Sequence, residues 1–182
     1  QLFIARKLIF KKWKQALGGN LSTISSGSAA LQPRLARIFT AAGITIAEGY
    51  GLTETSPVIS VNDMRGNQLK IGSVGPLLDD VEVKIAEDGE ILCKGPNVMM
   101  GYYKDKKKTN EVIKDGYFHT GDIGHIDKEG FLKITDRKKE MFKTSGGKYI
   151  APQVIENSMK QSIFIDPVSY THLTLPTKEE GG

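Results

Sequence analysis

The residues of this sequence best suited to chemistry lie at 48–57, directly after a predicted strand. Gly51 lets the backbone approach a ligand, and the Thr53 hydroxyl can donate to a phosphate oxygen. Tyr50 offers a flat ring to a base, and the Glu54 carboxylate can hold a hard cation. Together these groups suit a nucleotide with its magnesium ion, although each residue type is also common in ordinary turns.

A second polar stretch, residues 117–122, ends in a glycine followed by Asp122. An ionised carboxylate accepts two hydrogen bonds side by side, which neighbouring ribose hydroxyls can donate. A turn at Gly121 would present Asp122 for that purpose. The structural alternative is an Asx turn that leads into a strand.

The third stretch, residues 135–148, carries a run of charges out of a strand and ends in Ser-Gly-Gly-Lys. Arg137 can donate to a ribose or phosphate oxygen, and the two glycines leave room for a thin ligand. A charged segment ending in glycines also suits a hinge. Spacing by itself is a weak basis for either interpretation.

The elements that must position these stretches follow from hydrophobic periodicity. Apolar residues at steps of three or four predict helices over residues 2–16, 31–42 and 152–161. Short apolar runs predict strands over 21–24 and 44–47, on either side of the second helix. Strand, helix, strand is the unit of a parallel sheet, in which ligands lie at the carboxyl ends of strands.

The middle of the chain alternates with period two, which predicts two β-hairpins. They comprise residues 81–85 with 90–94, and residues 125–126 with 131–134. Between them, residues 104–114 predict a short, solvent-facing helix.

Composition limits the class of protein. The chain is 39% hydrophobic and 25% charged, as in globular proteins, and no apolar run approaches the roughly 18 to 20 residues of a membrane span. The N-terminus resembles no intact signal peptide. The single cysteine, Cys93, forms no internal disulfide and lies in an alternating stretch as a small core residue. These features predict a reducing, cytoplasmic setting, and one distant cysteine makes zinc binding by His119 and His125 a poor interpretation.

Charge is unevenly distributed: residues 1–47 carry seven Lys or Arg and no acid, within a net charge of +4. A basic module that grips nucleic acid or anionic lipid would look like this. However, no basic run is interleaved with aromatic residues, so solvated helix faces are the favoured interpretation and no nucleic-acid partner is expected.

Four segments, in this order and spacing, resemble the adenylate-forming enzymes, the family of acyl-CoA synthetases and firefly luciferase. The segments are Tyr50-Gly51-Leu52-Thr53-Glu54, Thr120-Gly121-Asp122, Asp136-Arg137-Lys138-Lys139-Glu140 and Gly146-Gly147-Lys148-Tyr149-Ile150-Ala151-Pro152. The amino-acid sequences of the last two segments are most similar to those of the long-chain fatty acyl-CoA synthetase branch. The resemblance covers the chain from its start to about residue 166.

The resemblance implies an α/β fold class with three parts. The end of a parallel-sheet large domain would occupy residues 1–70, and a small β-rich, barrel-like subdomain residues 71–135. The hinge and the start of a small α+β C-terminal domain would occupy 136–166. Residues 167–182 match nothing in the family, and we expect them to be disordered or artefactual.

The activity implied is a two-step ligation that uses ATP, Mg2+ and coenzyme A. A fatty acid carboxylate attacks the α-phosphate of ATP to give an acyl-adenylate and pyrophosphate; the small domain then rotates, and the thiol of coenzyme A displaces AMP. The partner is a fatty acid or another carboxylate. The full-length enzyme would be cytoplasmic, and peripheral contact with a membrane stays open.

The resemblance also assigns roles to individual residues. In the catalytic turn, Thr53 would contact phosphate and Glu54 would bind Mg2+. Asp136 would be the hinge, and Gly147 would lie where the pantetheine arm of coenzyme A passes. The nucleotide-binding set would comprise Gly27, Ser28, Ala29, Tyr50, Gly51, Thr53, Asp122 and Arg137.

Two expected parts are missing from the sequence: a phosphate loop ending in Pro-Lys-Gly and a lysine near the C-terminus that meets the α-phosphate. We therefore expect an interior fragment with negligible ligase activity in isolation. Two alternatives stay open: another acyl- or aryl-CoA ligase or adenylate-forming enzyme, and a non-catalytic basic module that binds polyanions.

Overall fold

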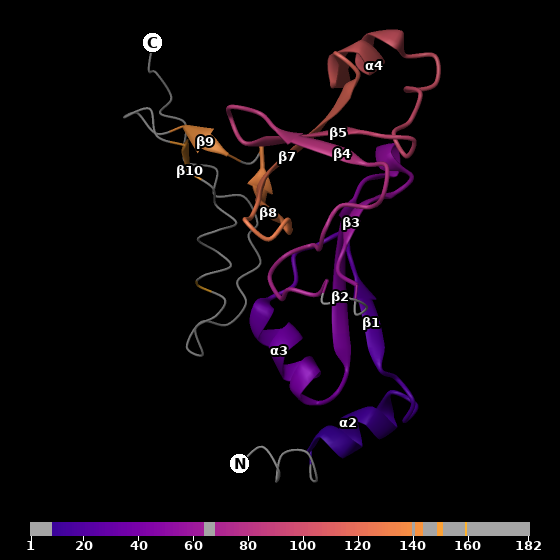
Figure 1. Ribbon diagram of the computed structural model, residues 1–182, viewed down its shortest axis with the longest axis vertical. Coiled ribbons are helices and arrows are strands. Elements are labelled where there is room, and N and C mark those ends of the chain that lie inside the picture. Colours follow the sequence, from indigo (N-terminus) through magenta and orange to yellow (C-terminus); the bar gives the residue numbers. More distant parts are fainter. Residues whose placement is uncertain (1–8, 64–67, 140, 144–148, 151–158, 160–182) are drawn as a thin grey trace, which may run out of the picture.

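Two sheets organise the computed structural model, which describes residues 9–63, 68–139, 141–143, 149–150 and 159 (Figure 1). The lower half of Figure 1 holds a three-stranded sheet with two helices: α2 (Lys11–Ala16), β1 (Thr23–Ser26), α3 (Pro33–Ala41), β2 (Thr45–Gly51) and β3 (Val58–Val61). The upper half holds a five-stranded antiparallel sheet and one helix: β4 (Glu82–Ile85), β5 (Glu90–Lys94), α4 (Lys106–Val112), β6 (Ile113–Lys114), β7 (Tyr117–Ile126) and β8 (Leu132–Arg137). A 3-10 turn, η2 (Thr53–Thr55), follows β2, and β9 (Phe142–Lys143) pairs with β10 (Tyr149–Ile150).

The predicted strand, helix, strand unit is confirmed. Strands β1 and β2 are parallel, and α3 connects them. Helix α3 begins at Pro33, whose missing N–H is harmless in a first turn, and the chain leaves it through Gly43 at φ +77°. Strand β1 begins two residues later than predicted, because the parallel register pairs Thr23 with Thr45. Strand β2 is longer than predicted because an unpredicted antiparallel partner, β3, extends the pairing to Gly51.

Both predicted hairpins are also confirmed. Strands β4 and β5 pair from Glu82 with Lys94 to Ile85 with Ile91, and the β7–β8 turn pairs Ile126 with Leu132. Strand β7 is the centre of this sheet, since it pairs with β5, β6 and β8 along different parts of its length. The sheet therefore curls around β7. The expected solvent-facing helix is α4, which leads directly into β6.

Four wholly buried side chains form the core that joins the two sheets: Ile59 from β3, Ile91 and Cys93 from β5, and Leu132 from β8. Burial raises the pKa of the Cys93 thiol to about 11, so it stays protonated at neutral pH. This confirms Cys93 as a core residue and not a nucleophile.

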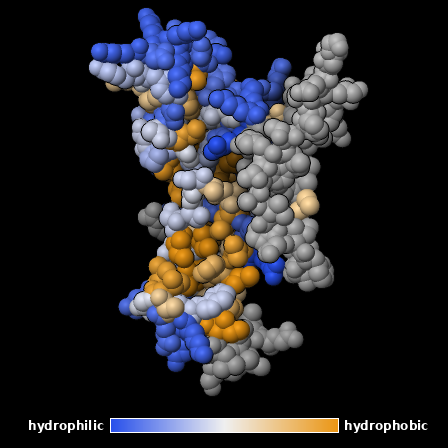
Figure 2. Space-filling model, turned by 180° about the vertical axis from the view of Figure 1, so that it is seen from behind, coloured by the Kyte–Doolittle hydropathy of each residue, from blue (hydrophilic) through white to orange (hydrophobic). Residues whose placement is uncertain are grey.

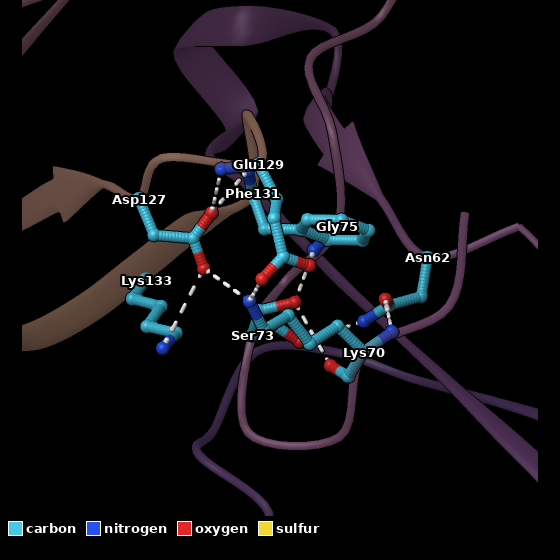
Figure 3. Close-up of polar contacts among 8 residues, drawn as sticks. All are labelled: Asn62, Lys70, Ser73, Gly75, Asp127, Glu129, Phe131 and Lys133. Atoms are coloured by element: carbon cyan, nitrogen blue, oxygen red, sulfur yellow. Dashed lines mark hydrogen bonds and ion pairs between the residues drawn. The ribbon is translucent and has the colours of Figure 1, made fainter. Parts of the chain in front are cut away.

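A polar clamp reinforces this joint (Figure 3). The Lys70 ammonium lies 2.8 Å from Asp127 Oδ2 and 2.9 Å from Glu129 Oε1, both in the β7–β8 turn. Backbone hydrogen bonds run alongside, from Val74 N to Leu132 O and from Leu132 N to Gly75 O, each 2.9 Å. The loop that follows β3 is thereby fixed against β8.

The surface differs between the two halves. Figure 2 shows apolar side chains gathered on the back of the lower half, whereas the upper end around α4 is hydrophilic. Helix α2 packs on α3 through Trp13 and Phe39, whose ring centroids lie 5.9 Å apart. None of the helices in the described residues is long and apolar enough to cross a membrane.

Several predictions concern residues outside those that the structure describes. These are the first part of the helix over 2–16, the helix over 152–161 apart from residue 159, Gly147, and the tail over 167–182.

Candidate functional site

The site is centred on three residues that come from three different strands. Tyr50 lies near the end of β2, Asp122 in the middle of β7, and Arg137 at the end of β8. The Tyr50 hydroxyl donates to Asp122 Oδ2 at 2.7 Å, and Arg137 Nε lies 3.6 Å from Asp122 Oδ1. One residue from each of the three predicted stretches thus lies at this carboxylate.

Asp122 lies in a bulge, which corrects the predicted glycine turn. Strand β5 pairs Leu92 with His119 and Glu90 with Ile123, so β7 carries two more residues than β5 between these pairs. Gly121 takes φ +74° within the bulge, a conformation that glycine adopts without strain. The bulge aims the Asp122 carboxylate at β2 and β8 while the strand continues past it.

The Thr120 hydroxyl fixes this bulge from within. It donates to Ile91 O at 2.8 Å and accepts from Asp122 N at 3.1 Å. Asp122 is only 8% exposed, so the oxygens of its side chain need polar partners within the protein. Tyr50 and Arg137 supply them.

Tyr50 is a neutral donor at any physiological pH. Burial raises the pKa of its phenol far above the ordinary value, and the neighbouring Asp122 carboxylate adds to this effect. The phenol therefore keeps its proton and continues to donate to Asp122. This hydrogen bond therefore fixes the Tyr50 ring, which was expected to lie against a base.

The Thr53–Glu54 turn is built around a third residue, Thr55. The buried Thr55 hydroxyl accepts from Leu52 N at 3.0 Å and is within 2.8 Å of Pro57 O, which closes η2. Thr53 is exposed at the start of this turn. Sequence reasoning missed Thr55, although a hydroxyl two residues before a proline is a recognisable turn signal.

Glu54 lines a cleft of about 1010 Å3, together with Leu52, Thr120 and Gly121. Its Oε1 accepts from the Tyr102 hydroxyl at 2.9 Å, and Met99 N donates to the Glu54 carbonyl. Among the described residues, only Tyr102 bonds to the Glu54 carboxylate, which leaves its second oxygen for a cation. Tyr102 was not predicted as a site residue.

Gly51 and Gly27 have different surroundings. A Cβ at Gly51 would lie 1.7 Å from Pro57 O, so the chain's own backbone requires a glycine at this position. Residues 27–29 follow the carboxyl end of β1, and a Cβ at Gly27 would lie 3.6 Å from Gly49 O on β2. They therefore lie beside the strand that carries Tyr50.

Asp136 is 1% exposed and precedes Arg137 at the end of β8. Its Oδ1 accepts from Arg137 N at 2.6 Å, whereas its Oδ2 has no hydrogen-bond partner among the described residues. The structure pairs Arg137 with Asp122 and Asp136 with Ile123 across β7 and β8. It includes no placement for Gly147.

The comparisons with known proteins agree with this geometry. A profile of the AMP-binding enzyme family matches residues 3–103. The chain is 45% identical over 154 residues to the long-chain-fatty-acid–CoA ligase FadD15 of Mycobacterium bovis, covering 85% of this chain and 25% of that ligase. It is 42% identical over 174 residues to the peroxisomal long chain acyl-CoA synthetase 7 of Arabidopsis thaliana, covering 87% and 25%.

Among solved structures, the fold matches the o-succinylbenzoate CoA synthetase of Bacillus subtilis in complex with ATP and magnesium ion. The TM-score is 0.68 at 30% identity, covering 84% of this chain and 35% of that one. The chain thus spans about a quarter of the length of the curated relatives that it matches. The order of the segments, the α/β fold with its curled antiparallel sheet, and these matches lead to one conclusion: the chain belongs to the AMP-binding enzyme family.

Proposed function

We propose that this chain supplies one side of the nucleotide site of an ATP-dependent, AMP-forming long-chain fatty acyl-CoA ligase. The observation that carries the proposal is the meeting of Tyr50, Asp122 and Arg137, from three separate strands, at one largely buried carboxylate. The names of the curated relatives support the reaction and the fatty acid substrate. In this reaction a fatty acid becomes an acyl-adenylate, and coenzyme A then takes the acyl group.

In this proposal, Asp122 accepts hydrogen bonds from the ribose hydroxyls, and Arg137 donates to the ribose or phosphate from the opposite side. Tyr50 offers its ring to the adenine, and its hydroxyl keeps Asp122 oriented. Residues 27–29 would complete the adenine and acyl side beside β2. Because these groups are fixed before the nucleotide arrives, little of its binding free energy is lost in ordering them.

The phosphates and Mg2+ would lie at the other end of the site, at the η2 turn. Thr53 is exposed there and can donate to a phosphate oxygen, and Glu54 offers a hard carboxylate oxygen beside the cleft. One carboxylate together with substrate phosphates is the coordination that Mg2+ commonly takes in nucleotide enzymes. The bound ion would offset the negative charge that develops during adenylation.

Coenzyme A would be the second substrate, with Gly147 beside its pantetheine arm, and Asp136 would be the hinge between the two half-reactions. Asp136 is buried near the end of β8, where the five-stranded sheet ends, and this position suits a hinge.

Nucleotide binding by the 182-residue chain is the direct test. We expect titration calorimetry to show weak AMP binding that Asp122→Asn reduces by about tenfold or more, since an NH2 donor replaces one of the two acceptor oxygens that would face the ribose hydroxyls and the charge is lost. Asp115→Asn is the matched control, because Asp115 is exposed at φ +50°, where asparagine is well tolerated.

Salt separates this function from polyanion binding by a basic module. A specific AMP pocket should lose little affinity between low and moderate salt, whereas counterion-driven binding falls steeply. Equal AMP affinity in the wild type and Asp122→Asn, with a steep salt dependence in both, would contradict the proposal.

Ligase activity is tested by transplanting the 154 matching residues into the M. bovis FadD15 ligase. The chimera should form long-chain acyl-CoA from ATP, fatty acid and coenzyme A, and Glu54→Gln in it should lower the rate most at limiting Mg2+. Preference for an aromatic acid over a fatty acid would transfer the assignment to another acyl-CoA ligase.

A further inference from the structure

A second buried carboxylate, Glu90 at the start of β5, lies directly behind the bulge that carries Asp122. Its side chain is 7% exposed, which is unusual for a glutamate next to a hairpin turn. Glu90 Oε1 accepts from Gly121 N at 3.0 Å, so it holds the backbone immediately before Asp122.

The other oxygen of Glu90 holds the segment that carries Arg137. Lys138 Nζ donates to Glu90 Oε2 at 2.8 Å, and His119 Nδ1 lies 3.2 Å from the same oxygen. Lys138 also bonds to the bulge through its backbone, since Lys138 N donates to Gly121 O at 2.8 Å.

These contacts form a closed ring. It runs from Glu90 to the amide of Gly121, from the carbonyl of Gly121 to the amide of Lys138, and from the Lys138 ammonium back to Glu90. Asp122 directly follows Gly121 in the sequence, and Arg137 directly precedes Lys138. A shift of either backbone would therefore break a ring contact.

The electrostatics favour this ring in its charged form. Burial opposes the charge on Glu90, but hydrogen bonds from Lys138, His119 and Gly121 outweigh it and hold the pKa of Glu90 below its ordinary value. Asp88 and Glu90 both contact the Lys138 ammonium and raise the pKa of Lys138. The carboxylate and the ammonium thus stay paired at neutral pH.

We propose that Glu90 is a positioning residue of the nucleotide site: through Gly121 and Lys138 it holds Asp122 and Arg137 at the spacing that a ribose needs. This inference rests on the proposed function of Asp122 and Arg137. In this role Glu90 would act through Gly121 and Lys138 and not through contact with the nucleotide.

The test compares the wild-type 182-residue chain with Glu90→Gln and Lys138→Met, using AMP titration and amide hydrogen exchange. Glutamine can still accept from Gly121 N but no longer pairs with the Lys138 ammonium. We expect AMP affinity to fall by about fivefold, and the amides of Gly121 and Lys138 to exchange about tenfold faster.

The direction of the affinity change is diagnostic. Removing a negative charge near the site should by itself strengthen binding of the anionic AMP, so a loss of affinity must come from lost positioning. Glu87→Gln is the matched control, because Glu87 is exposed in the same β4–β5 turn and its removal changes the charge equally. It should bind AMP at least as well as the wild type.

If Glu90→Gln folds poorly, Lys138→Met tests the ring through amide exchange at Gly121, since the Lys138 side chain is 46% exposed and loss of its positive charge would by itself weaken AMP binding. The double variant should lose no more affinity than either single variant, and Lys138→Arg should restore binding. A purely structural role would instead lower the melting temperature and leave the AMP affinity of the folded chain unchanged.

The two failures are separable. Absence of AMP binding by the wild type contradicts the proposed function. Unchanged exchange at Gly121 and Lys138 in Glu90→Gln contradicts the ring, whatever the wild type binds.

Discussion

The hydroxyl of Tyr50 donates to Asp122 Oδ2 at 2.7 Å across 72 residues of sequence. This hydrogen bond joins β2 of the first sheet to β7 of the second, beside the apolar core made by Ile59, Ile91, Cys93 and Leu132. This one contact therefore both helps to hold the two sheets together and orients the candidate ribose carboxylate.

Removing this hydroxyl should weaken the contact between the two sheets and loosen the orientation of Asp122. We expect Tyr50→Phe to lower the free energy of unfolding by about 1–2 kcal/mol, because the nearly buried Asp122 loses a donor. Urea denaturation checks the stability, and AMP titration should show weaker binding. Tyr103→Phe is the control, since Tyr103 is 87% exposed; an equal effect of both variants would remove any special role for the Tyr50 hydroxyl.

Periodicity and turn chemistry predicted the local elements well. The β1–α3–β2 unit, both hairpins and α4 follow from patterns that operate within a few residues, such as Pro33 in a first turn and Gly43 after a helix. Tyr50 was expected at the adenine and Asp122 at the ribose, but their direct contact was not predicted, because no local pattern specifies a contact across 72 residues.

The sequence was less informative about features that depend on tertiary packing. The bulge at Gly121 depends on the register between β5 and β7, so a glycine turn was predicted instead. Glu90 was predicted only as part of a hairpin strand over 90–94, because the contacts of its side chain with Lys138 and His119 form only in the folded sheet. Strand β3 is short and was missed for the same reason: its pairing with β2 defines it.

The buried hydroxyl of Thr55 should prove necessary for the Thr53–Glu54 turn. Thr55→Val keeps the shape of the side chain but leaves Leu52 N without its partner, so we expect a loss of about 1–3 kcal/mol in unfolding free energy. Thermal or urea unfolding measures it. Thr55→Ser, which keeps the hydroxyl, should lose less; a serine variant as unstable as the valine variant would assign the effect to the lost methyl group.

The glycine at position 51 should tolerate no side chain. Gly51→Ala would place Cβ 1.7 Å from the carbonyl oxygen of Pro57. This oxygen belongs to the backbone, so it cannot rotate away from the clash as a side chain could. We expect circular dichroism to show a chain that is largely unfolded at room temperature. Gly27→Ala, where the nearest atom lies 3.6 Å away, should fold normally; a well-folded Gly51→Ala would show that the β2–η2 connection can rearrange.

The clamp between Lys70 and Asp127 predicts how stability depends on acid. Hydrogen bonding from Lys70, with help from Phe131 N and Glu129 N, holds the pKa of Asp127 far below its ordinary value of about 3.9. A depressed folded-state pKa contributes stability that is present above the unfolded pKa and is lost as the pH falls toward the folded one. The free energy of unfolding should therefore decrease from about pH 5 downward.

Lys70→Met removes the main cause of that shift, so its stability should depend less steeply on pH over the same range. Urea denaturation of both proteins at pH 5 and pH 3 measures the difference. Lys128→Met removes an exposed positive charge from the same β7–β8 turn and should keep the wild-type slope. Identical slopes for the wild type and Lys70→Met would show that other carboxylates, such as Glu90 with its lowered pKa, dominate the acid response.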